Sequence, residues 1–325
     1  MIVSILVPEH SVMQAIADPQ YLFSAVNHLI TMSGKKPMSE IQLVGEKREV
    51  KLNGGLFSIH TTHLLSDVKK TDLVIIPALF GDMKQGIDSN QLMLPWIKQQ
   101  YTKGADVASL CVGAFLLAST GLLNGKKCST HWGFQQELSA MFPAVDVIDG
   151  SVITEENRIY TSGGANSYWS LLLHLVEKYT DREMAILAAK YFAIDIDRES
   201  QAAYAMFQRQ KNHTDEAVLQ AQDYIDANIQ ERIRIDELAA YVSLGRRSFE
   251  RRFKLATNNS VLEYINRVKI EFAKRRFELS RKNMNEVMYD IGYSDTKSFR
   301  TIFKKITGLT PIEYRNKYNK MSVEE

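Results

Sequence analysis

Long hydrophobic runs, a basic leader segment and paired cysteines are all lacking in this sequence. No stretch approaches the roughly 18 consecutive apolar residues of a membrane span, and no basic residue precedes the short apolar run in the opening MIVSILVPEH. The two cysteines, Cys111 and Cys128, are too few for a disulfide framework and are not spaced like a zinc ligand set. We therefore expect a cytoplasmic protein with free thiols, no membrane segment and no bound metal.

The length and the charge distribution predict two domains with different roles. The 325 residues exceed what one hydrophobic core usually organises. Residues 1–180 hold 14 Lys and Arg against 16 Asp and Glu, whereas residues 230–320 hold 21 against 11. A near-neutral front followed by a basic back is typical of a chain whose second part binds nucleic acid.

The basic part contains an internal repeat. The pairs Asp236 with Glu286 and Leu238 with Met288 are similar residues that lie 50 positions apart. So many matches without a gap predict a duplicated supersecondary unit. Eight residues are identical to the residue 50 positions later: Ser248, Phe249, Phe253, Lys254, Thr257, Glu263, Tyr264 and Asn266.

Each copy has the pattern of two helices joined by a tight turn. In the first copy, apolar residues between positions 235 and 242 recur at helical spacing, and Ser243-Leu244-Gly245 ends that pattern. The next helix buries two phenylalanines one turn apart. The second copy repeats this arrangement on either side of the IGYSD turn, residues 291–295.

The second helix of each copy has a polar, mostly basic outer face. Such a face is what reading a DNA major groove requires, because Arg and Lys neutralise phosphates and donate hydrogen bonds to guanine edges. A single face of this kind is also compatible with a merely solvated helix, but its repetition in both copies favours DNA binding. The candidate DNA-binding residues are Arg246, Arg247, Glu250 and Arg251 in the first copy, and Thr296, Lys297, Arg300, Thr301 and Lys304 in the second.

The segment between the copies, residues 261–279, predicts one continuous helix. It contains no Pro or Gly. About 19 residues at 1.5 Å each span roughly 28 Å, comparable with the ~34 Å between successive major grooves on one face of DNA. Its apolar residues fall at helical spacing: Leu262, Ile265, Val268, Phe272 and Ala273.

Residues 216–318 resemble the AraC/XylS family of transcription activators. The stretch IGYSDTKSFRTIFKKITGLTPIEYR, residues 291–315, follows the family signature. The resemblance implies two helix-turn-helix units joined by a long helix, in an all-α domain. Val261 stands where many members have Pro, whereas the second copy keeps Pro311. By position, the family's base-reading residues correspond to Arg247, Glu250, Arg251, Lys297, Arg300 and Thr301.

The front half alternates strand and helix patterns. Apolar runs at 2–8, 41–46, 72–78 and 106–111 predict strands, and helical patterns occur at about 20–32, 91–103 and 112–121. This alternation predicts an α/β domain with a flavodoxin-like, doubly wound parallel sheet covered on both faces. Ligands of such sheets bind at the carboxyl ends of the strands, which is where Cys111 falls.

Cys111 is the candidate nucleophile. It precedes a helical pattern that begins near Gly113, so we expect the helix N-terminus to lower its pKa and the N–H groups of Val112 and Gly113 to face an anion. His131, 20 residues later, is a possible partner. If the site were catalytic, Cys111 and His131 would be its candidate residues.

Residues 1–180 resemble the ThiJ/PfpI group of the class I glutamine-amidotransferase-like superfamily, through CVGAFLLASTGLLNGKKCSTHW and IYTSGGANSYWSLLLHLVEKYTD. Joined to an AraC-like domain, the front half resembles the GlxA-like regulator architecture, and this resemblance implies that the front domain is a small-molecule sensor and dimerisation module. ThiJ/PfpI enzymes place a Glu beside the cysteine, but Gln14 occupies that register here. The amidotransferase His-x-Glu pair is also absent, which favours a pocket-lining or structural Cys111 over a catalytic one.

The histidines of HTTH, His60 and His63, predict no metal site. They follow an LNGG hairpin in an extended stretch, where residues three apart face opposite ways. No cofactor is expected either. We place the sensor domain at residues 1–190, a connector at 191–213 and the DNA-binding domain at 214–320.

These observations predict a homodimeric transcriptional regulator that binds double-stranded DNA and responds to a small-molecule effector. The effector pocket is expected to include Gln14, Cys111, Val112, Gly113 and His131. The alternative is a cysteine-dependent hydratase or hydrolase of the ThiJ/PfpI type with an attached DNA-binding domain. The missing carboxylate favours the sensor, and an enzyme does not need the duplicated basic unit.

Overall fold

The computed structural model describes residues 1–195, 202, 206–207 and 209–319, and it divides into two compact units, Met1–Gln201 and Ala202–Glu325. Most of the middle of the expected connector, and residue 320, lie outside the described residues. The described end of the connector packs on the second unit, since Arg209 pairs with Asp226 at 3.2 Å and His213 lies 3.1 Å from the Gln222 side chain.

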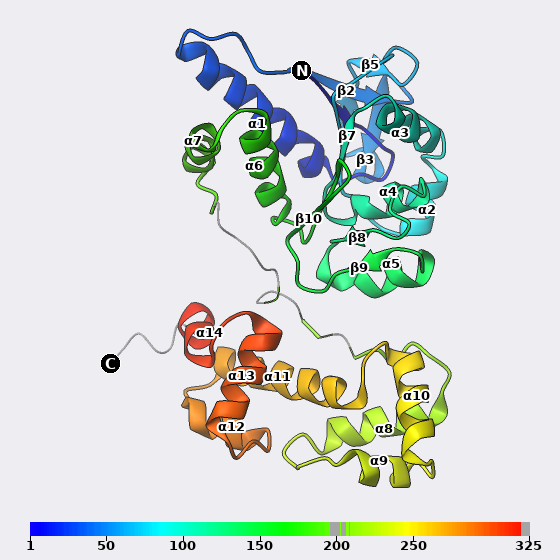
Figure 1. Ribbon diagram of the computed structural model, residues 1–325, viewed down its shortest axis with the longest axis vertical. Helices are drawn as coiled ribbons and strands as arrows, with labels where there is room; N and C mark the ends of the chain where they lie inside the picture. The colour runs from blue at the N-terminus through cyan, green and yellow to red at the C-terminus, as the bar shows by residue number, and fades with distance from the viewer. Residues whose placement is uncertain (196–201, 203–205, 208, 320–325) are drawn as a thin grey trace. The chain divides into compact units, whose positions relative to one another are not determined.

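The first unit is built on a seven-stranded sheet with the order β10-β11-β7-β6-β1-β2-β5 (Figure 1). Every neighbouring pair is parallel except the β10–β11 hairpin at one edge. The predicted doubly wound parallel sheet is therefore confirmed. The strands are β1 (Ile2–Leu6), β2 (Glu40–Gly45), β5 (His63–Leu64), β6 (Leu73–Ile76), β7 (Asp106–Ser109), β10 (Ile153–Glu156) and β11 (Ile159–Ser162).

Helices cover both faces of this sheet. On one side α1 (Met13–Met32), α6 (Tyr168–Tyr179) and α7 (Arg182–Phe192) pack on one another, and on the other side α4 (Ala114–Ser119) packs on α2 (Met83–Asp88) and α3 (Met93–Thr102) (Figure 1). β6 and β7 are buried along their whole length, as expected of parallel strands covered on both faces. Smaller elements are the β3 (Glu49–Leu52) and β4 (Phe57–His60) hairpin, β8 (Lys127–Cys128), β9 (Asp146–Val147) and α5 (Gln135–Met141).

Helix α1 begins at Met13, earlier than the predicted start near residue 20, and it continues through Pro19. Proline removes one helical hydrogen bond. Ala15, Ile16 and Pro19 are all buried against the core, and this packing offsets the lost bond. The sequence pattern missed the first two turns because proline usually marks a helix boundary.

The second unit is helical, as predicted, and is organised around α11 (Val261–Leu279), one continuous helix of 19 residues. Helices α8, α10, α12, α13 and α14 all pack on it. Leu262, which we placed in its apolar stripe, is exposed, and Tyr264 takes that place in the core. The remaining helices are α8 (Glu216–Ala227), α9 (Ile235–Tyr241), α10 (Arg246–Thr257), α12 (Met284–Asp290), α13 (Thr296–Thr307) and α14 (Pro311–Tyr318).

The sequence repeat is a structural repeat. Phe249 and Phe253 of α10 are fully buried, as are Phe299 and Phe303 of α13. The threonine that ends each helix donates a 2.8 Å hydrogen bond to the carbonyl four residues earlier. In each copy a tyrosine of the following helix meets the second phenylalanine edge-on, with ring centroids 5.2 Å and 5.5 Å apart.

The ungapped alignment of the first helices is wrong by one residue. Ser243 and Gly292 are the turn residues with positive φ, 56° and 69°, and they lie 49 positions apart. The second turn is one residue longer, so Leu238 corresponds to Val287 and not to Met288. The core is preserved because the extra residue is accommodated in the turn, outside both helices.

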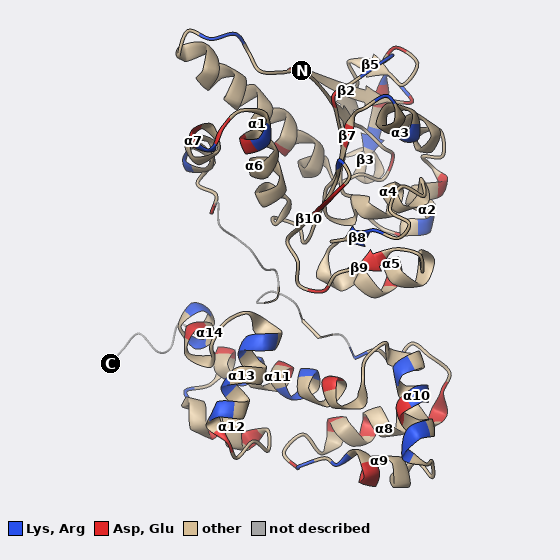
Figure 2. Ribbon diagram, viewed as in Figure 1, with Lys and Arg blue, Asp and Glu red and all other residues tan. Residues whose placement is uncertain are grey.

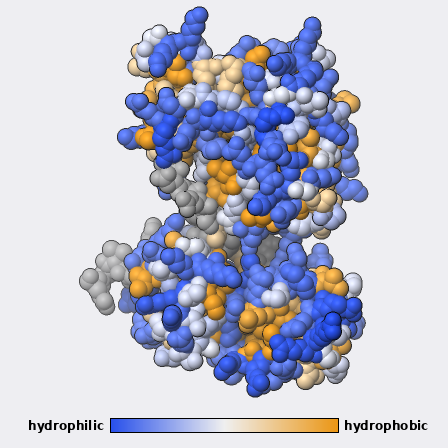
Figure 3. Space-filling model, in the orientation of Figure 1, coloured by the Kyte–Doolittle hydropathy of each residue, from blue (hydrophilic) through white to orange (hydrophobic). Residues whose placement is uncertain are grey.

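No helix in the described ranges is long and apolar enough to cross a membrane. The visible surface of each unit is mostly hydrophilic, with small apolar areas between polar ones (Figure 3).

Candidate functional sites

Cys111 lies directly beyond the carboxyl end of β7, in a short 3-10 turn, Cys111–Gly113, that leads into α4. Its φ is 55°, in the left-handed region that costs a non-glycine residue of order 1 kcal/mol. The surrounding chain holds this conformation: the Cys111 N–H donates to Ser162 Oγ at 3.2 Å, and Thr130 Oγ1 donates to the Cys111 carbonyl at 3.1 Å. The predicted placement of the cysteine at the strand end is confirmed.

Gly113 allows the turn to pack tightly on the end of β6. A Cβ at this position would lie 2.6 Å from the carbonyl oxygen of Pro77 and 2.8 Å from that of Ile76. Both are backbone atoms, so a side chain at 113 would displace the turn. The sharp strand-turn-helix connection thus depends on this glycine.

The Cys111 thiol is buried. Its residue is only 5% exposed, and burial raises the pKa of Cys111 to about 12, although the Val112 N–H favours the thiolate. We expected the helix N-terminus to lower this pKa, and that prediction is wrong. The cause is that desolvation outweighs the backbone dipoles, since the thiol lies inside the core and not at an open helix end.

His131 and Gln14, the other predicted site residues, make no hydrogen bond to Cys111 within the described ranges. His131 is half-buried, its Nδ1 accepts from the Gly133 N–H at 3.0 Å, and burial lowers its pKa. The ring is therefore neutral near pH 7, with its proton assigned to Nε2. Gln14 is exposed in the first turn of α1. Val112 and Gly113 are buried beside the cysteine.

A carboxylate that sequence reasoning missed lies one turn beyond Gln14. Asp18 Oδ2 accepts from the Tyr168 hydroxyl at 2.6 Å and from Trp169 Nε1 at 3.1 Å. Burial and the hydrogen bond with Asp18 raise the pKa of Tyr168. The sequence offered one signal for Asp18: it lies four residues after Gln14, so the two residues share one side of the helix.

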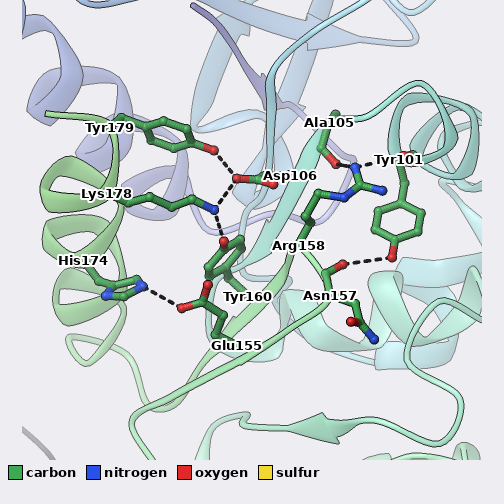
Figure 4. Close-up of polar contacts among 10 residues, drawn as sticks. All are labelled: Tyr101, Ala105, Asp106, Glu155, Asn157, Arg158, Tyr160, His174, Lys178 and Tyr179. Atoms are coloured by element: carbon green, nitrogen blue, oxygen red, sulfur yellow. Dashed lines mark hydrogen bonds and ion pairs between the residues drawn. The ribbon is translucent and has the colours of Figure 1, made fainter.

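A second polar cluster holds α6 at the other end of β7 (Figure 4). Asp106, the first residue of β7, accepts from Lys178 Nζ at 2.8 Å and from the Tyr179 hydroxyl. His174 Nε2 lies 3.0 Å from Glu155 on β10. Because Cys111 follows the opposite end of β7, this cluster fastens α6 to the sheet and does not belong to the cysteine site.

The two histidines of HTTH lie in different sheets. His60 ends β4 of the small hairpin, and His63 begins β5 of the main sheet. Within the described ranges, no group of three or more His, Cys, Asp or Glu side chains is arranged to hold a metal ion.

The second helix of the first copy, α10, presents exposed arginines (Figure 2). In the described part of the chain, Arg247 and Arg251 form no ion pair, whereas Arg246 pairs with Asp236 at 3.1 Å and with Glu250 at 3.3 Å. Arg247 and Arg251 are therefore available to a ligand, whereas Arg246 is already neutralised within the protein.

The corresponding helix of the second copy, α13, has no acid along its length. Lys297, Arg300, Thr301 and Lys304 are exposed, and within the described ranges the three cations among them form no ion pair, while Thr296 is half-buried. The helix starts at an N-cap, Asp295, that accepts from the Ser298 N–H at 2.7 Å. The structure thus brings the predicted residues of each copy to one solvent-facing helix side.

Two protein-family models match the chain in the order of its units. The DJ-1/PfpI family model matches residues 20–178, and a helix-turn-helix domain model matches residues 238–317. The chain combines a DJ-1/PfpI-family domain with a helix-turn-helix domain. The two resemblances drawn from the sequence are confirmed.

Known proteins similar to this chain include regulators and ThiJ/PfpI proteins. It is 27% identical over 221 residues to the HTH-type transcriptional regulator GbdR of Pseudomonas aeruginosa, an alignment that covers 68% of this chain and 60% of GbdR. The chain therefore spans less than two thirds of that relative's length.

Among solved structures, a ThiJ/PfpI family protein from Pseudomonas syringae has a TM-score of 0.51 at 19% identity, covering 62% of this chain and 78% of that chain. An AraC family transcriptional regulator from Pseudomonas putida has a TM-score of 0.50 at 18% identity, covering 59% and 98%. At these identities the likeness concerns the fold.

Proposed function

We propose that this protein is a DNA-binding transcriptional regulator whose DJ-1/PfpI domain binds a small-molecule effector. The observation that carries the proposal is the duplicated helix-turn-helix unit, in which each second helix exposes cations that no acid of the described chain neutralises. The similarity to GbdR, which is named a transcriptional regulator, supports it.

The spacing of the two copies supports binding to one face of a duplex. Helix α11 is 19 residues long, which corresponds to about 28 Å, and successive major grooves on one face of B-DNA are ~34 Å apart. Arg247, Glu250 and Arg251 then read bases in one groove. Lys297, Arg300 and Thr301 read bases in the next, while Lys304 contacts the backbone.

The effector site is proposed at the cysteine turn, with Cys111, Val112, Gly113, His131 and Gln14 around it. The hydrogen bond from Thr130 to the Cys111 carbonyl supports this grouping, because it fixes the loop that carries His131 beside the turn. Parallel α/β sheets bind ligands at the carboxyl ends of their strands. Asp18, on the same helix as Gln14, joins this set.

The thiol chemistry supports a sensor over an enzyme. Because burial raises the pKa of Cys111 to about 12, the protonated thiol dominates at pH 7, whereas the thiolate is the nucleophilic form. Iodoacetamide labelling of Cys111, located by mass spectrometry, should therefore accelerate about tenfold per pH unit from pH 7 to 10. A labelling rate that reaches a plateau near pH 7 would favour the hydrolase alternative.

DNA binding is tested with the full chain and a duplex selected from a random library. Arg300→Ala should weaken binding at fixed salt by roughly 5- to 150-fold, corresponding to about 1–3 kcal/mol for a base contact. Lys98→Ala on α3, an exposed cation of the other domain, is the matched control and should bind like the parent. If no duplex is enriched, or if both variants bind alike, the proposal is wrong.

A further inference from the structure

Each helix-turn-helix copy packs aromatic residues on a different end of α11. Tyr264, in the first half of the helix, meets Phe253 of α10 with ring centroids 5.2 Å apart, and Phe277, in its last turn, meets Phe303 of α13 at 5.7 Å. Residues 264 and 277 are about 20 Å apart along the helix axis. Each copy is therefore anchored at its own end, and the contacts between the two anchors determine how one copy is oriented relative to the other.

Lys269, near the middle of α11, lies between these two anchors. It is 5% exposed, and its Nζ donates to the carbonyl of Glu231 at 2.7 Å and to that of Ile291 at 2.8 Å. Glu231 lies in the loop between α8 and α9 that leads into the first copy, and Ile291 is the C-cap of α12 in the second copy. One buried ammonium group thus joins the two copies through their backbones.

The loop and the turn also approach each other closely. A Cβ on Gly292 would lie 2.4 Å from the carbonyl oxygen of Gln230. The next residue, Tyr293, donates from its hydroxyl to Asn266 Oδ1 on α11 at 2.9 Å, and Lys269 Nζ lies 5.6 Å from the centre of its ring. Backbone segments of both copies therefore meet at one buried lysine. We name this cluster, residues 230–231, 266, 269 and 291–293, the junction.

A buried lysine costs more free energy than an apolar side chain of the same length. Burial disfavours the charged ammonium and lowers the pKa of Lys269, an effect that the charge of Glu231 partly opposes. Hydrogen bonds to two carbonyls compensate for the lost hydration. A methionine would fill the same space without that cost, but it would donate to neither carbonyl. The stabilisation that Lys269 provides is therefore directional, because it holds one backbone atom of each copy in place.

We propose that Lys269 is a positioning residue for DNA binding, which sets the spacing between the two base segments that α10 and α13 read. The inference rests on the proposed function and adds what holds the two helices at one separation and rotation. One base pair moves a DNA segment by about 3.4 Å and rotates it by about 35° around the duplex axis. A junction held on both sides does not follow that rotation, so the chain should discriminate between spacings that differ by a single base pair.

A competing explanation is that Lys269 only stabilises the domain. The residue 50 positions later supplies a matched control, because Asn319 is 2% exposed and its Nδ2 donates to the carbonyls of Phe277 at 2.6 Å and Ser280 at 2.8 Å. Both carbonyls belong to the end of α11 and the residue after it, on the side of the second copy. Asn319→Leu should therefore lower the melting temperature without releasing the junction.

The first test measures the affinity of the full chain for the selected duplex and for duplexes whose two bound segments are moved apart or together by one base pair. The parent should bind the altered spacings at least ~10-fold more weakly. Lys269→Met should bind all three spacings within about threefold of one another, whereas Asn319→Leu should keep the parental penalty. A parent that tolerates every spacing, an unchanged penalty in Lys269→Met, or an equal loss of the penalty in Asn319→Leu overturns the proposal.

A milder variant covers the case in which Lys269→Met is unfolded by circular dichroism. Tyr293→Phe removes the hydroxyl that contacts Asn266 and keeps the ring. It should reduce the spacing penalty at least about threefold, and an unchanged penalty would overturn the proposal.

The second test needs no DNA and so separates failure of the junction from failure of the proposed function. Nitroxide labels are attached through Leu255→Cys and Lys305→Cys, exposed positions 50 residues apart on α10 and α13, while both native cysteines are buried. Pulsed electron resonance on labelled chains diluted with unlabelled protein gives the distance distribution between the two helices. Lys269→Met should broaden this distribution relative to the parent, and an unchanged distribution overturns the junction even if the chain binds DNA. If no duplex is enriched, the proposed function fails while this measurement still decides whether Lys269 holds the two copies.

Discussion

The two helix-turn-helix copies share a scaffold but differ in how their cations are held. Helix α10 carries five Arg and Lys with Glu250, and α13 carries four with no acid, so the two helices have the same net charge. In the first copy Arg246 is paired with Asp236 and Glu250, and Arg252 is paired with Asp215. Net charge therefore does not describe what each helix offers to DNA.

The comparison indicates a division of work between the copies. The first copy carries Glu250, which contacts Arg246, and a glutamate can accept from a cytosine amino group. The cations of α13 form no ion pair within the described ranges and are free to neutralise phosphates. We expect the first copy to contribute more to sequence discrimination and the second more to salt-dependent affinity.

The largest expected effect concerns the two turns. Gly292 has φ 69°, and a Cβ there would lie 2.4 Å from the carbonyl oxygen of Gln230, whereas Ser243 occupies the equivalent position of the first turn with a side chain. Gly292→Ala should destabilise the AraC-type domain by about 3 kcal/mol or more. Ser243→Ala, the matched control, should change stability by less than about 1 kcal/mol. Thermal unfolding followed by circular dichroism compares them, and equal melting temperatures would refute the packing argument.

The next effect concerns an ion pair that only the first copy can form. Arg252 contacts Asp215 through two hydrogen bonds of 2.8 Å and 2.7 Å, and Ile302 stands at the equivalent position of the second copy. Because both side chains are partly exposed, Arg252→Ala should lower stability only slightly at pH 7. Urea unfolding of the parent and the variant measures the difference.

The pH dependence of that difference has a definite sign. The hydrogen bond with Arg252 lowers the pKa of Asp215, aided by the Val218 N–H. The folded state therefore holds the proton less tightly than the unfolded chain, whose Asp titrates near pH 3.9. The extra stability is complete above that pH and is lost as the pH falls through the lower, folded-state pKa. A stability difference that instead grows on acidification would contradict the ion-pair explanation.

The smallest effect compares two equivalent lysines. Lys254 Nζ donates to the Asn258 carbonyl at 2.6 Å, whereas the described structure shows no such bond for Lys304. Lys304→Ala should reduce the slope of log K against log salt by about 1, as expected for one lost phosphate contact. Lys254→Ala should reduce it less. Salt titrations of binding to the selected duplex measure both slopes, and a larger loss for Lys254→Ala would reverse the proposed division.

The fold was largely predictable from residue spacing. The paired phenylalanines, the 19-residue segment without Pro or Gly, and the alternating strands each define a buried side that propensity and periodicity indicate. The sequence-based predictions failed where tertiary contacts determine the local structure. The longer second turn is invisible in an ungapped repeat, and α1 passes through Pro19 because core packing holds it.

The chemistry of the sites was less predictable. Local sequence placed Cys111 correctly at a strand end, but its pKa depends on burial by segments far away in the chain. The Asp18 carboxylate accepts hydrogen bonds from Tyr168 and Trp169, which lie 150 and 151 positions later in the chain. Ion pairing of Arg246 and Arg252 likewise depends on acids of other helices, so the basic face could be predicted but the availability of its charges could not.

The central claim is that both helix-turn-helix copies read DNA at once. Hydroxyl-radical footprinting of the full chain on its selected duplex tests this most directly. We predict two protected segments centred about one helical turn, ~10 base pairs, apart, with Arg251→Ala losing protection in one segment and Arg300→Ala losing it in the other. A single protected segment, or two segments that both variants weaken equally, would contradict the account.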